Sequence, residues 1–513
     1  MTNHLFGAFR SHMPAPDRLL METDDDRSIT YGDMLAQSAQ LAHALVQAGV
    51  EPGDRVAVQV EKSPEAALLY LASLRAGAVF LPLNTAYTLP ELDYFFRDAE
   101  PRLIVCDPDR LSGVEPLAAS IGASVLTLGR DGQGTLASQA SRQATEFSDV
   151  ARGPDDLAAI LYTSGTTGRS KGAMLSHENL ASNARVLVEQ WRFGADDVLI
   201  HALPIFHTHG LFVATNVVLM AGAIMLFEQK FDPARILSLM PRATALMGVP
   251  TFYVRLLQQD GLTREAARAI RVFISGSAPL LAETHKAWRE RTGHAILERY
   301  GMTETNMNTS NPYDGERRAG TVGFPLPGVS LRIADPEDGS ELAQGEIGMI
   351  EVKGPNVFGG YWRMPEKTRA EFRDDGFFIT GDLGLVDADG YVHIVGRGKD
   401  LIISGGYNVY PKEIESEIDA LDGVSESAVI GVAHPDFGEG VTAVVVRKPG
   451  SAINAADIAG AIAGRLAKYK HPKQVIFVDE LPRNTMGKVQ KNVLREMYKD
   501  IYAKPANNNA SSS

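Results

Sequence analysis

Short apolar runs alternate with helix-like stretches over most of the 513-residue chain. The segment 31–49, YGDMLAQSAQLAHALVQAG, is an example of the helical pattern. The runs that we interpret as strands are 55–60, 78–83, 103–107, 124–128, 158–163, 223–228 and 271–276. Strands that alternate with helices favour mainly parallel sheets, so we expect an α/β architecture.

The pattern changes after about residue 320, where apolar runs follow one another through tight turns. Asp389-Gly390 lies between two such runs and is a typical hairpin signal. We therefore expect an antiparallel sheet or a small antiparallel β-barrel over about 320–396, inside a large N-terminal domain that covers 1–396.

Residues 397–403 form a predicted hinge, and a compact α+β domain is expected at 404–503. Pro411 suits a helix start, and apolar residues then recur along one helical face. Asn454 is a suitable cap for a second amphipathic helix. The polar, low-complexity end at 504–513 is expected to be a disordered tail.

Charge and composition narrow the class of protein. The chain has 50 Lys and Arg against 63 Asp and Glu residues, a net charge of −13, which does not support nucleic-acid or membrane-surface binding. The most apolar stretch, 211–227, is interrupted by polar residues and is shorter than the ~20 residues of a spanning helix. The single Cys106 excludes a disulfide framework and a multi-cysteine metal site. The N-terminus lacks a signal-peptide pattern, and we expect a cytoplasmic protein that binds neither membrane nor nucleic acid.

The segment TSGTTGRSKG, residues 163–172, directly follows an apolar strand. Its glycines permit tight turns and close backbone approach, its hydroxyl groups add donors, and Lys171 adds a positive charge. These are the properties of a loop that holds phosphate groups. The loop does not match the Walker A pattern, so it predicts phosphate binding of another kind.

Four further segments resemble known sequence motifs. They are RYGMTE (299–304), TGDLG (380–384), GRGKDLIISGGYNVYPKEIE (396–415) and PRNTMGKVQK (482–491). Together with 163–172 they resemble the motifs of the adenylate-forming superfamily, which includes the acyl-CoA synthetases with their luciferase and peptide-synthetase relatives. The resemblance implies a small mobile C-terminal domain and a two-step reaction. A carboxylic acid and ATP give an acyl-adenylate and pyrophosphate, and CoA then gives the thioester and AMP.

The resemblance implies roles for individual residues. Tyr300 would face the adenine, Thr303 would lie near the α-phosphate, and Glu304 would hold Mg²⁺ with the phosphate oxygens. Asp382 would accept hydrogen bonds from the ribose, and Arg397 would contact ribose or phosphate. The full expected ATP site comprises Thr163, Ser164, Gly165, Thr166, Thr167, Gly168, Lys171, Ser277, Ala278, Glu298, Tyr300, Gly301, Met302, Asp382 and Arg397.

The C-terminal motifs carry the remaining implied roles. Lys488 would neutralise charge on the α-phosphate during adenylation, and acylation of Lys488 by a regulatory acyltransferase would remove that charge. Lys399 matches the hinge position about which the small domain would turn. Residues implied to line the CoA channel are Ser404, Gly405, Gly406, Tyr407 and Lys470. The cationic cluster of Arg465, Lys468, Lys470 and Lys473 either faces the CoA phosphates or is a solvated surface.

Three residues bear on which carboxylic acid is the substrate. PIFHTHG, 204–210, resembles the family segment that places His207 beside the acyl pocket, so His207 is a catalytic or gating candidate. Arg255 stands where fatty-acid and aryl relatives mostly have apolar side chains, and this resembles the malonyl-CoA synthetase branch. An arginine in a closed pocket needs a partner, which a second substrate carboxylate would supply. Arg255, His207 and Ser277 would then hold malonate or methylmalonate, unless Arg255 points to solvent or meets a protein carboxylate.

Other activities fit the same motifs. A short-chain or aromatic monocarboxylate–CoA ligase differs only in the acyl pocket. A luciferase-type oxygenase would use the same scaffold for a different reaction. A non-catalytic nucleotide-binding protein is disfavoured by the intact Lys171, Glu304, Asp382 and Lys488.

Overall fold

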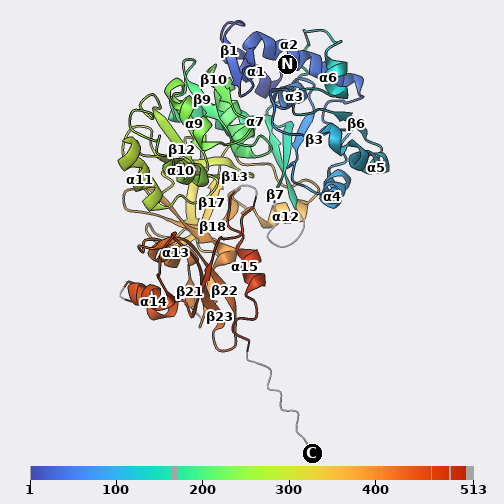
Figure 1. Cartoon of the computed structure of the whole chain (residues 1–513). Coiled ribbons are helices and arrows are strands. Elements are labelled where there is room, and N and C mark those ends of the chain that lie inside the picture. The colour runs from blue at the N-terminus through green and yellow to red at the C-terminus, as the bar shows by residue number, and fades with distance from the viewer. Residues whose placement is uncertain (1, 164–169, 406, 464, 485–486, 504–513) are drawn as a thin grey trace, which may run out of the picture.

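The computed structural model describes residues 2–163, 170–405, 407–463, 465–484 and 487–503. Its strands form four sheets, and the elements from β20 onward gather at one end of the molecule, beyond β17 and β18 (Figure 1). The helices are α1 (His4–His12), α2 (Tyr31–Gln47), α3 (Pro64–Arg75), α4 (Leu89–Ala99), α5 (Leu111–Ile121), α6 (Thr135–Ala140), α7 (His177–Gln190), α8 (Asn216–Ala221), α9 (Pro233–Leu239), α10 (Pro250–Leu257), α11 (Ala282–Thr292), α12 (Pro365–Ala370), α13 (Pro411–Asp419), α14 (Ala455–Ala463) and α15 (Lys491–Met497).

Two mainly parallel sheets make up most of the large domain. The six-stranded sheet has the order β6-β5-β3-β4-β7-β8 and the nine-stranded sheet the order β15-β14-β13-β12-β11-β9-β10-β1-β2. The first contains β3 (Arg55–Gln59), β4 (Val79–Pro82), β5 (Leu103–Cys106), β6 (Ser124–Thr127), β7 (Leu157–Thr163) and β8 (Lys171–Ser176). The second contains β1 (Leu19–Thr23), β2 (Ser28–Thr30), β9 (Val198–His201), β10 (Ile224–Phe227), β11 (Ala245–Gly248), β12 (Val272–Ser275), β13 (Leu297–Met302), β14 (Asn306–Ser310) and β15 (Phe324–Pro325). All seven strands expected from the apolar runs are present, which confirms the α/β prediction.

The third sheet is the expected antiparallel region. It consists of β16 (Ser330–Ala334), β17 (Gly348–Lys353), β18 (Phe378–Val386) and β19 (Val392–Arg397). The predicted turn at Asp389-Gly390 joins β18 to β19, with Gly390 at a φ of 88°. The expected barrel needs correction, because the strands pair in the open order β16-β17-β18-β19 and do not close into a barrel.

The fourth sheet belongs to the small domain. It is built from β20 (Ile402–Ser404), β21 (Tyr407–Val409), β22 (Val424–His434), β23 (Gly438–Arg447) and β24 (Gln474–Val478). Pro411 begins α13 as predicted, and the Asn454 side chain accepts from the first backbone N–H groups of α14. Two apolar clusters of this domain contain only residues from 402 to 502, so the small domain has its own core. The expected tail, 504–513, lies outside the described residues.

The topology places several chain segments at one edge of the nine-stranded sheet. β9, β11, β12 and β13 run parallel, so their carboxyl ends meet there. The most apolar stretch continues from a π-helix at His209–Thr215 into α8 and β10, and nearly all of its side chains are buried. Within the described residues no helix is long and apolar enough to cross a membrane. Because ligands of open α/β sheets bind outside the carboxyl ends of strands, this edge is the place to look for a site.

Candidate active site

The phosphate-type loop connects two antiparallel neighbours of the six-stranded sheet. Thr163 ends β7 and pairs with Lys171 at the start of β8. The predicted ligands Ser164, Gly165, Thr166, Thr167 and Gly168 lie outside the described residues. Lys171 Nζ lies 3.1 Å from Glu371 Oε1 and 4.1 Å from the centre of the Tyr361 ring. The loop's cation is therefore held by an acidic partner that the sequence patterns did not indicate.

Glu304 lies beside this loop and is 5% exposed. Thr163 Oγ1 lies 3.5 Å and Tyr361 Oη 3.0 Å from Glu304 Oε1, and burial raises the pKa of Glu304. Tyr361 Oη is also 2.6 Å from Glu371 Oε2, yet a hydroxyl has one proton and can donate to one carboxylate at a time. Among the described residues, Glu304 has no lysine or arginine within ion-pair distance. Lys171 and Arg397 act on the Glu304 carboxylate only from beyond that distance, so the carboxylate fits a Mg²⁺ ligand.

The described residues contain no group of three or more His, Cys, Asp or Glu that would hold a metal ion by themselves. Mg²⁺ commonly uses one or two carboxylates and completes its shell with waters and phosphate oxygens. Glu304 therefore fits a metal that arrives with a nucleotide rather than one that resides in a protein cage.

The predicted adenine and ribose residues are brought together. Tyr300 Oη donates to Asp382 Oδ2 at 2.6 Å, and Arg397 Nε lies 2.8 Å from Asp382 Oδ1. β18 and β19 place Asp382 and Arg397 opposite each other in register. The neighbouring Asp382 carboxylate raises the pKa of Arg397. Each carboxylate oxygen keeps a lone pair for a sugar hydroxyl, so Asp382 is oriented for that role.

The rest of the predicted nucleotide segment covers the end of β13 and the turn that leads to β14. A Cβ added to Gly301 would lie 1.8 Å from Asn306 O, so only glycine fits there. Met302 and Thr303 are half-buried next to it. Glu298, earlier on β13, accepts from Leu280 N at 3.3 Å, and burial raises its pKa to about 8.

A second group of predicted residues lies where β12 ends. Ser277 has a φ of 73°, a left-handed conformation that is strained for a residue with a side chain, and Ala278 follows it. Ser277 Oγ lies 3.2 Å from Nδ1 of His209, a buried residue that the sequence reasoning passed over. His207 has a buried Nε2 with no hydrogen-bond partner among the described residues, and burial lowers its pKa to about 3. Burial lowers the pKa of both histidines, which favours their neutral forms.

Arg299 is the feature that the motif reading missed. It is 3% exposed, and its Nε and Nη2 have no hydrogen-bond partner within the described part of the chain. A Cβ added to Gly276 would lie 2.4 Å from Arg299 Cζ, so the guanidinium packs directly on the backbone that leads to Ser277. Burial lowers the pKa of Arg299 to about 9, and burial followed by the Arg299 charge lowers the pKa of His209. A desolvated, unpaired guanidinium is costly, which indicates that an anion from outside completes it.

Lys488 reaches the same cleft from the small domain. Asn484 O accepts from Gly487 N and Asn484 Oδ1 accepts from Lys488 N, both at 2.9 Å. The Lys488 side chain is exposed to solvent at its surface. Protein atoms nevertheless lie around the ammonium group, and this desolvation, followed by the charge of Arg397, lowers the pKa of Lys488. Asp382, Glu304 and Arg299 also act on Lys488 electrostatically. Both properties fit a side chain inside a cleft between the two domains.

Arg255 does not have the closed environment expected for it. Its side chain is exposed on α10, a helix whose Thr251 would lie 3.4 Å from a Cβ added to Gly487. An exposed guanidinium is solvated and needs no partner to stay charged. The argument that a buried arginine requires a second carboxylate therefore applies to Arg299 and not to Arg255.

The implied CoA residues make contacts of their own. Ser404 is buried, Gly405 has a φ of 61°, and Gly406 lies outside the described residues. Tyr407 is 57% exposed and stacks on Tyr469 with ring centres 4.6 Å apart.

The expected cationic cluster is partly paired. Lys470 Nζ lies 2.5 Å from Glu413 and Arg465 Nη1 lies 3.0 Å from Glu417. These two ion pairs weaken the case that the whole cluster faces phosphate. Lys399 has an exposed side chain at the predicted hinge, although nearby protein partly desolvates its ammonium group and so lowers its pKa.

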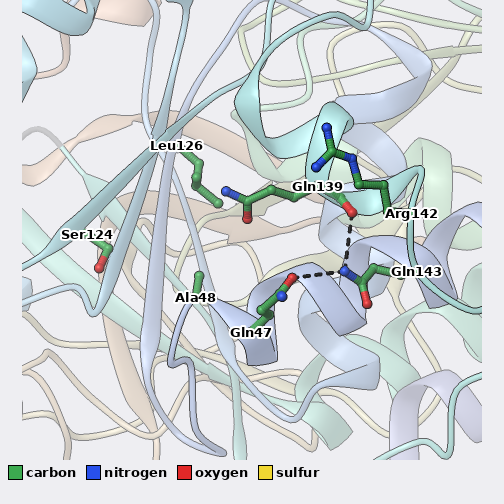
Figure 2. Close-up of a pocket in the computed structure, with 7 residues that line it drawn as sticks. All are labelled: Gln47, Ala48, Ser124, Leu126, Gln139, Arg142 and Gln143. Atoms are coloured by element: carbon green, nitrogen blue, oxygen red, sulfur yellow. Dashed lines mark hydrogen bonds between the residues drawn. The ribbon is translucent and has the colours of Figure 1, made fainter.

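A surface pocket of about 580 Å³ lies apart from these residues, between α2, β6 and α6 (Figure 2). Gln143 Nε2 donates to Gln47 Oε1 at 2.9 Å and to Gln139 O at 3.3 Å. None of the predicted site residues lines this pocket. We do not assign the chemistry to this pocket.

Comparisons with known proteins agree with the geometry. Residues 10–362 match the family described as AMP-binding enzyme, and residues 413–488 match its C-terminal domain. A feruloyl-CoA synthase of Amycolatopsis sp is 37% identical over 92% of this chain and 94% of its own. A malonate–CoA ligase of Arabidopsis thaliana is 33% identical over 96% of this chain and 90% of its own.

Solved structures give a nearer relative. MatB from Rhodopseudomonas palustris with bound ATP is 66% identical, covers 98% of this chain and 100% of that one, and has a TM-score of 0.96. The apo structure of the same protein, with the same coverage, gives a TM-score of 0.86. The structure of this chain is therefore more similar to the ATP-bound structure of that protein than to its apo structure.

Proposed function

We propose that malonate is the acid activated by this chain, which belongs to the AMP-binding enzyme family and is an ATP-dependent acyl-CoA ligase. One malonate carboxylate attacks the α-phosphate of ATP and releases pyrophosphate. The CoA thiol then attacks the acyl carbon of the adenylate, and AMP leaves. The products are malonyl-CoA, AMP and pyrophosphate. Methylmalonate differs by one methyl group and is proposed as a second substrate.

Arg299 is the single observation that carries the choice of malonate. A buried guanidinium with two unpaired N–H-bearing nitrogens matches a carboxylate in charge and geometry. Acetate or an aryl acid would leave this charge desolvated and unpaired, whereas malonate offers its distal carboxylate. His209 and Ser277 lie around the same place, and Arg255 remains a second candidate cation at the cleft. The malonate–CoA ligase of Arabidopsis thaliana supports the same choice.

The remaining site residues suit the first step. Tyr300 and Asp382 position the nucleoside, while Lys171 and the loop 163–171 hold the outgoing pyrophosphate. Mg²⁺, with Glu304 and the phosphate oxygens as ligands, supplies neutralising charge when bound. Lys488 stabilises the charge that develops on the α-phosphate. Acylation of Lys488 would remove that charge and switch off the first step, and a cytoplasmic location would expose it to acyltransferases.

A second candidate is an aromatic acyl-CoA ligase, favoured by the 37% identity to feruloyl-CoA synthase. An aryl group would place apolar surface against Arg299 and leave the guanidinium unpaired. This is energetically poor, so we rank it below malonate.

An acid panel separates the two. CoA-dependent AMP release is measured with malonate, methylmalonate, acetate, benzoate and ferulate. We expect malonate to give the highest kcat/KM. Faster turnover of benzoate, ferulate or acetate than of malonate would refute the proposal.

A further inference from the structure

The two domains are joined by the short segment 397–400. Its first residue makes contacts with the large domain and its last residue with the small domain. On the large-domain side, Arg397 closes β19 in register with Asp382, and its Nε lies 2.8 Å from that carboxylate. Its Nη1 also donates to Thr380 O at 3.2 Å. Strand pairing and two side-chain contacts therefore fix Arg397 to the large domain.

On the small-domain side, Asp400 is tied to α15. Arg495 Nη2 donates to Asp400 Oδ1 at 2.6 Å, and the two side chains are 29% and 14% exposed. Leu494, the residue before Arg495, is buried in an apolar cluster made only of small-domain residues. The helix that carries Arg495 belongs to the small domain, so Asp400 is tied to that domain.

Gly398 and Lys399 are the two residues between these ties. With Asp400 they form one 3₁₀ turn, and Leu401 N donates to Gly398 O at 3.2 Å. Lys399 has an exposed side chain, and a Cβ added to Gly398 would meet no atom closer than 3.4 Å. Neither residue is locked by packing, so backbone rotation is least hindered here.

We propose that Arg495 is a positioning residue that confines the turning of the small domain to the backbone torsions of Gly398 and Lys399. The proposal rests on the proposed two-step function, in which the small domain must withdraw Lys488 and present another surface to CoA. Hinges absorb such motion at a few residues. When Arg495 holds Asp400, the small domain turns as a rigid body about two residues. Loss of the Arg495–Asp400 ion pair adds Asp400 and Leu401 to the residues about which the small domain turns. The domain then samples more orientations and adopts the orientation needed for the CoA step less often.

The test compares the two half-reactions in full-length Arg495→Ala and Arg495→Lys. ATP–pyrophosphate exchange with malonate reports adenylation, and single-turnover transfer from enzyme-bound adenylate to CoA reports thioester formation. We expect exchange to stay within about two-fold of the unmodified protein while transfer falls about five-fold in Arg495→Ala, the effect of losing a part-buried ion pair. Arg495→Lys should keep most of the transfer rate because the charge pair is retained.

Controls separate a positioning role from general destabilisation. Lys499→Ala removes a neighbouring exposed pair with Glu496 and should change neither half-reaction. The exchanged double variant Asp400→Arg with Arg495→Asp should transfer faster than either single variant. Unchanged transfer in Arg495→Ala, or equal loss of both half-reactions, overturns the proposal. Failure of the unmodified protein to exchange with malonate would instead refute the malonate assignment, and the same ratio would then be measured with the acid that the panel identifies.

Discussion

Replacing Arg299 by Met removes the buried guanidinium while keeping a long, flexible side chain. In the unmodified protein this charge is already desolvated, so under the malonate proposal the distal carboxylate would gain a full partner on binding. Removing one member of a buried charged pair costs about 2–5 kcal/mol. At about 1.4 kcal/mol per ten-fold, kcat/KM for malonate should fall roughly 30- to 4000-fold. Acetate has no distal carboxylate, so its kcat/KM should change little.

The assay is ATP–pyrophosphate exchange with malonate and acetate below saturation, which gives the ratio of the two kcat/KM values. Gly276→Ala is a second perturbation of the same contact, because its Cβ would lie 2.4 Å from Arg299 Cζ and would displace the guanidinium. Arg317→Met is the matched control. Arg317 is a half-buried arginine whose guanidinium nitrogens donate to three backbone carbonyls, so it should leave the malonate-to-acetate ratio unchanged. Arg255→Ala is measured in parallel and should have the smaller effect.

Three outcomes would refute the role of Arg299 in choosing the acid. If malonate and acetate fall by the same factor in Arg299→Met, Arg299 supports the fold and does not choose the acid. A large loss of thermal stability without substrate would also count against it. An unpaired buried charge destabilises the free protein, so its removal should leave the melting temperature unchanged or higher. If only Arg255→Ala lowers the ratio, the distal carboxylate binds there instead.

Two further predictions concern the first step. Lys488→Ala should lower adenylation by at least about 100-fold, because it removes a positioned charge at the α-phosphate, and should largely spare thioester formation from supplied acyl-adenylate. Equal loss of both steps would contradict this division. Glu304→Gln should raise the Mg²⁺ concentration needed for half-maximal exchange by roughly ten-fold or more, while chelation of Mg²⁺ should stop exchange in both proteins. An unchanged Mg²⁺ dependence would show that Glu304 is not a ligand.

The main elements of the fold could be predicted because their causes are local. Buried parallel strands appear as apolar runs of five or six residues, and the hairpin at Asp389-Gly390 depends on a turn that favours glycine. The closure of the antiparallel region could not be predicted in this way. Whether β16 meets β19 depends on the twist and packing of the whole sheet, which no local pattern records.

The site residues that lie within the sequence motifs could be predicted. Tyr300, Asp382 and Arg397 were expected from separate motifs, and the structure joins them by hydrogen bond and ion pair. Partners outside the motifs, such as Glu371 beside Lys171, could not be predicted, because they depend on distant segments meeting in space. Arg299 did leave a signal. It follows Glu298 in an otherwise apolar strand, and adjacent residues on a strand point to opposite faces, so at least one charge had to be buried.

The pairing of the cleft cations indicates how a dicarboxylate would lie. Lys171 is paired with Glu371, and Arg397 with Asp382, so these charges are already compensated. Within the described part of the chain, Arg299 and Lys488 have no ion pair, although each acts electrostatically on the same cleft. An acid with one carboxylate can satisfy one of them. A short acid with two can place its reacting end toward Lys488 and the α-phosphate and its distal end on Arg299. A chain with a net charge of −13 would therefore select an anionic substrate through two local cations and not through its overall field.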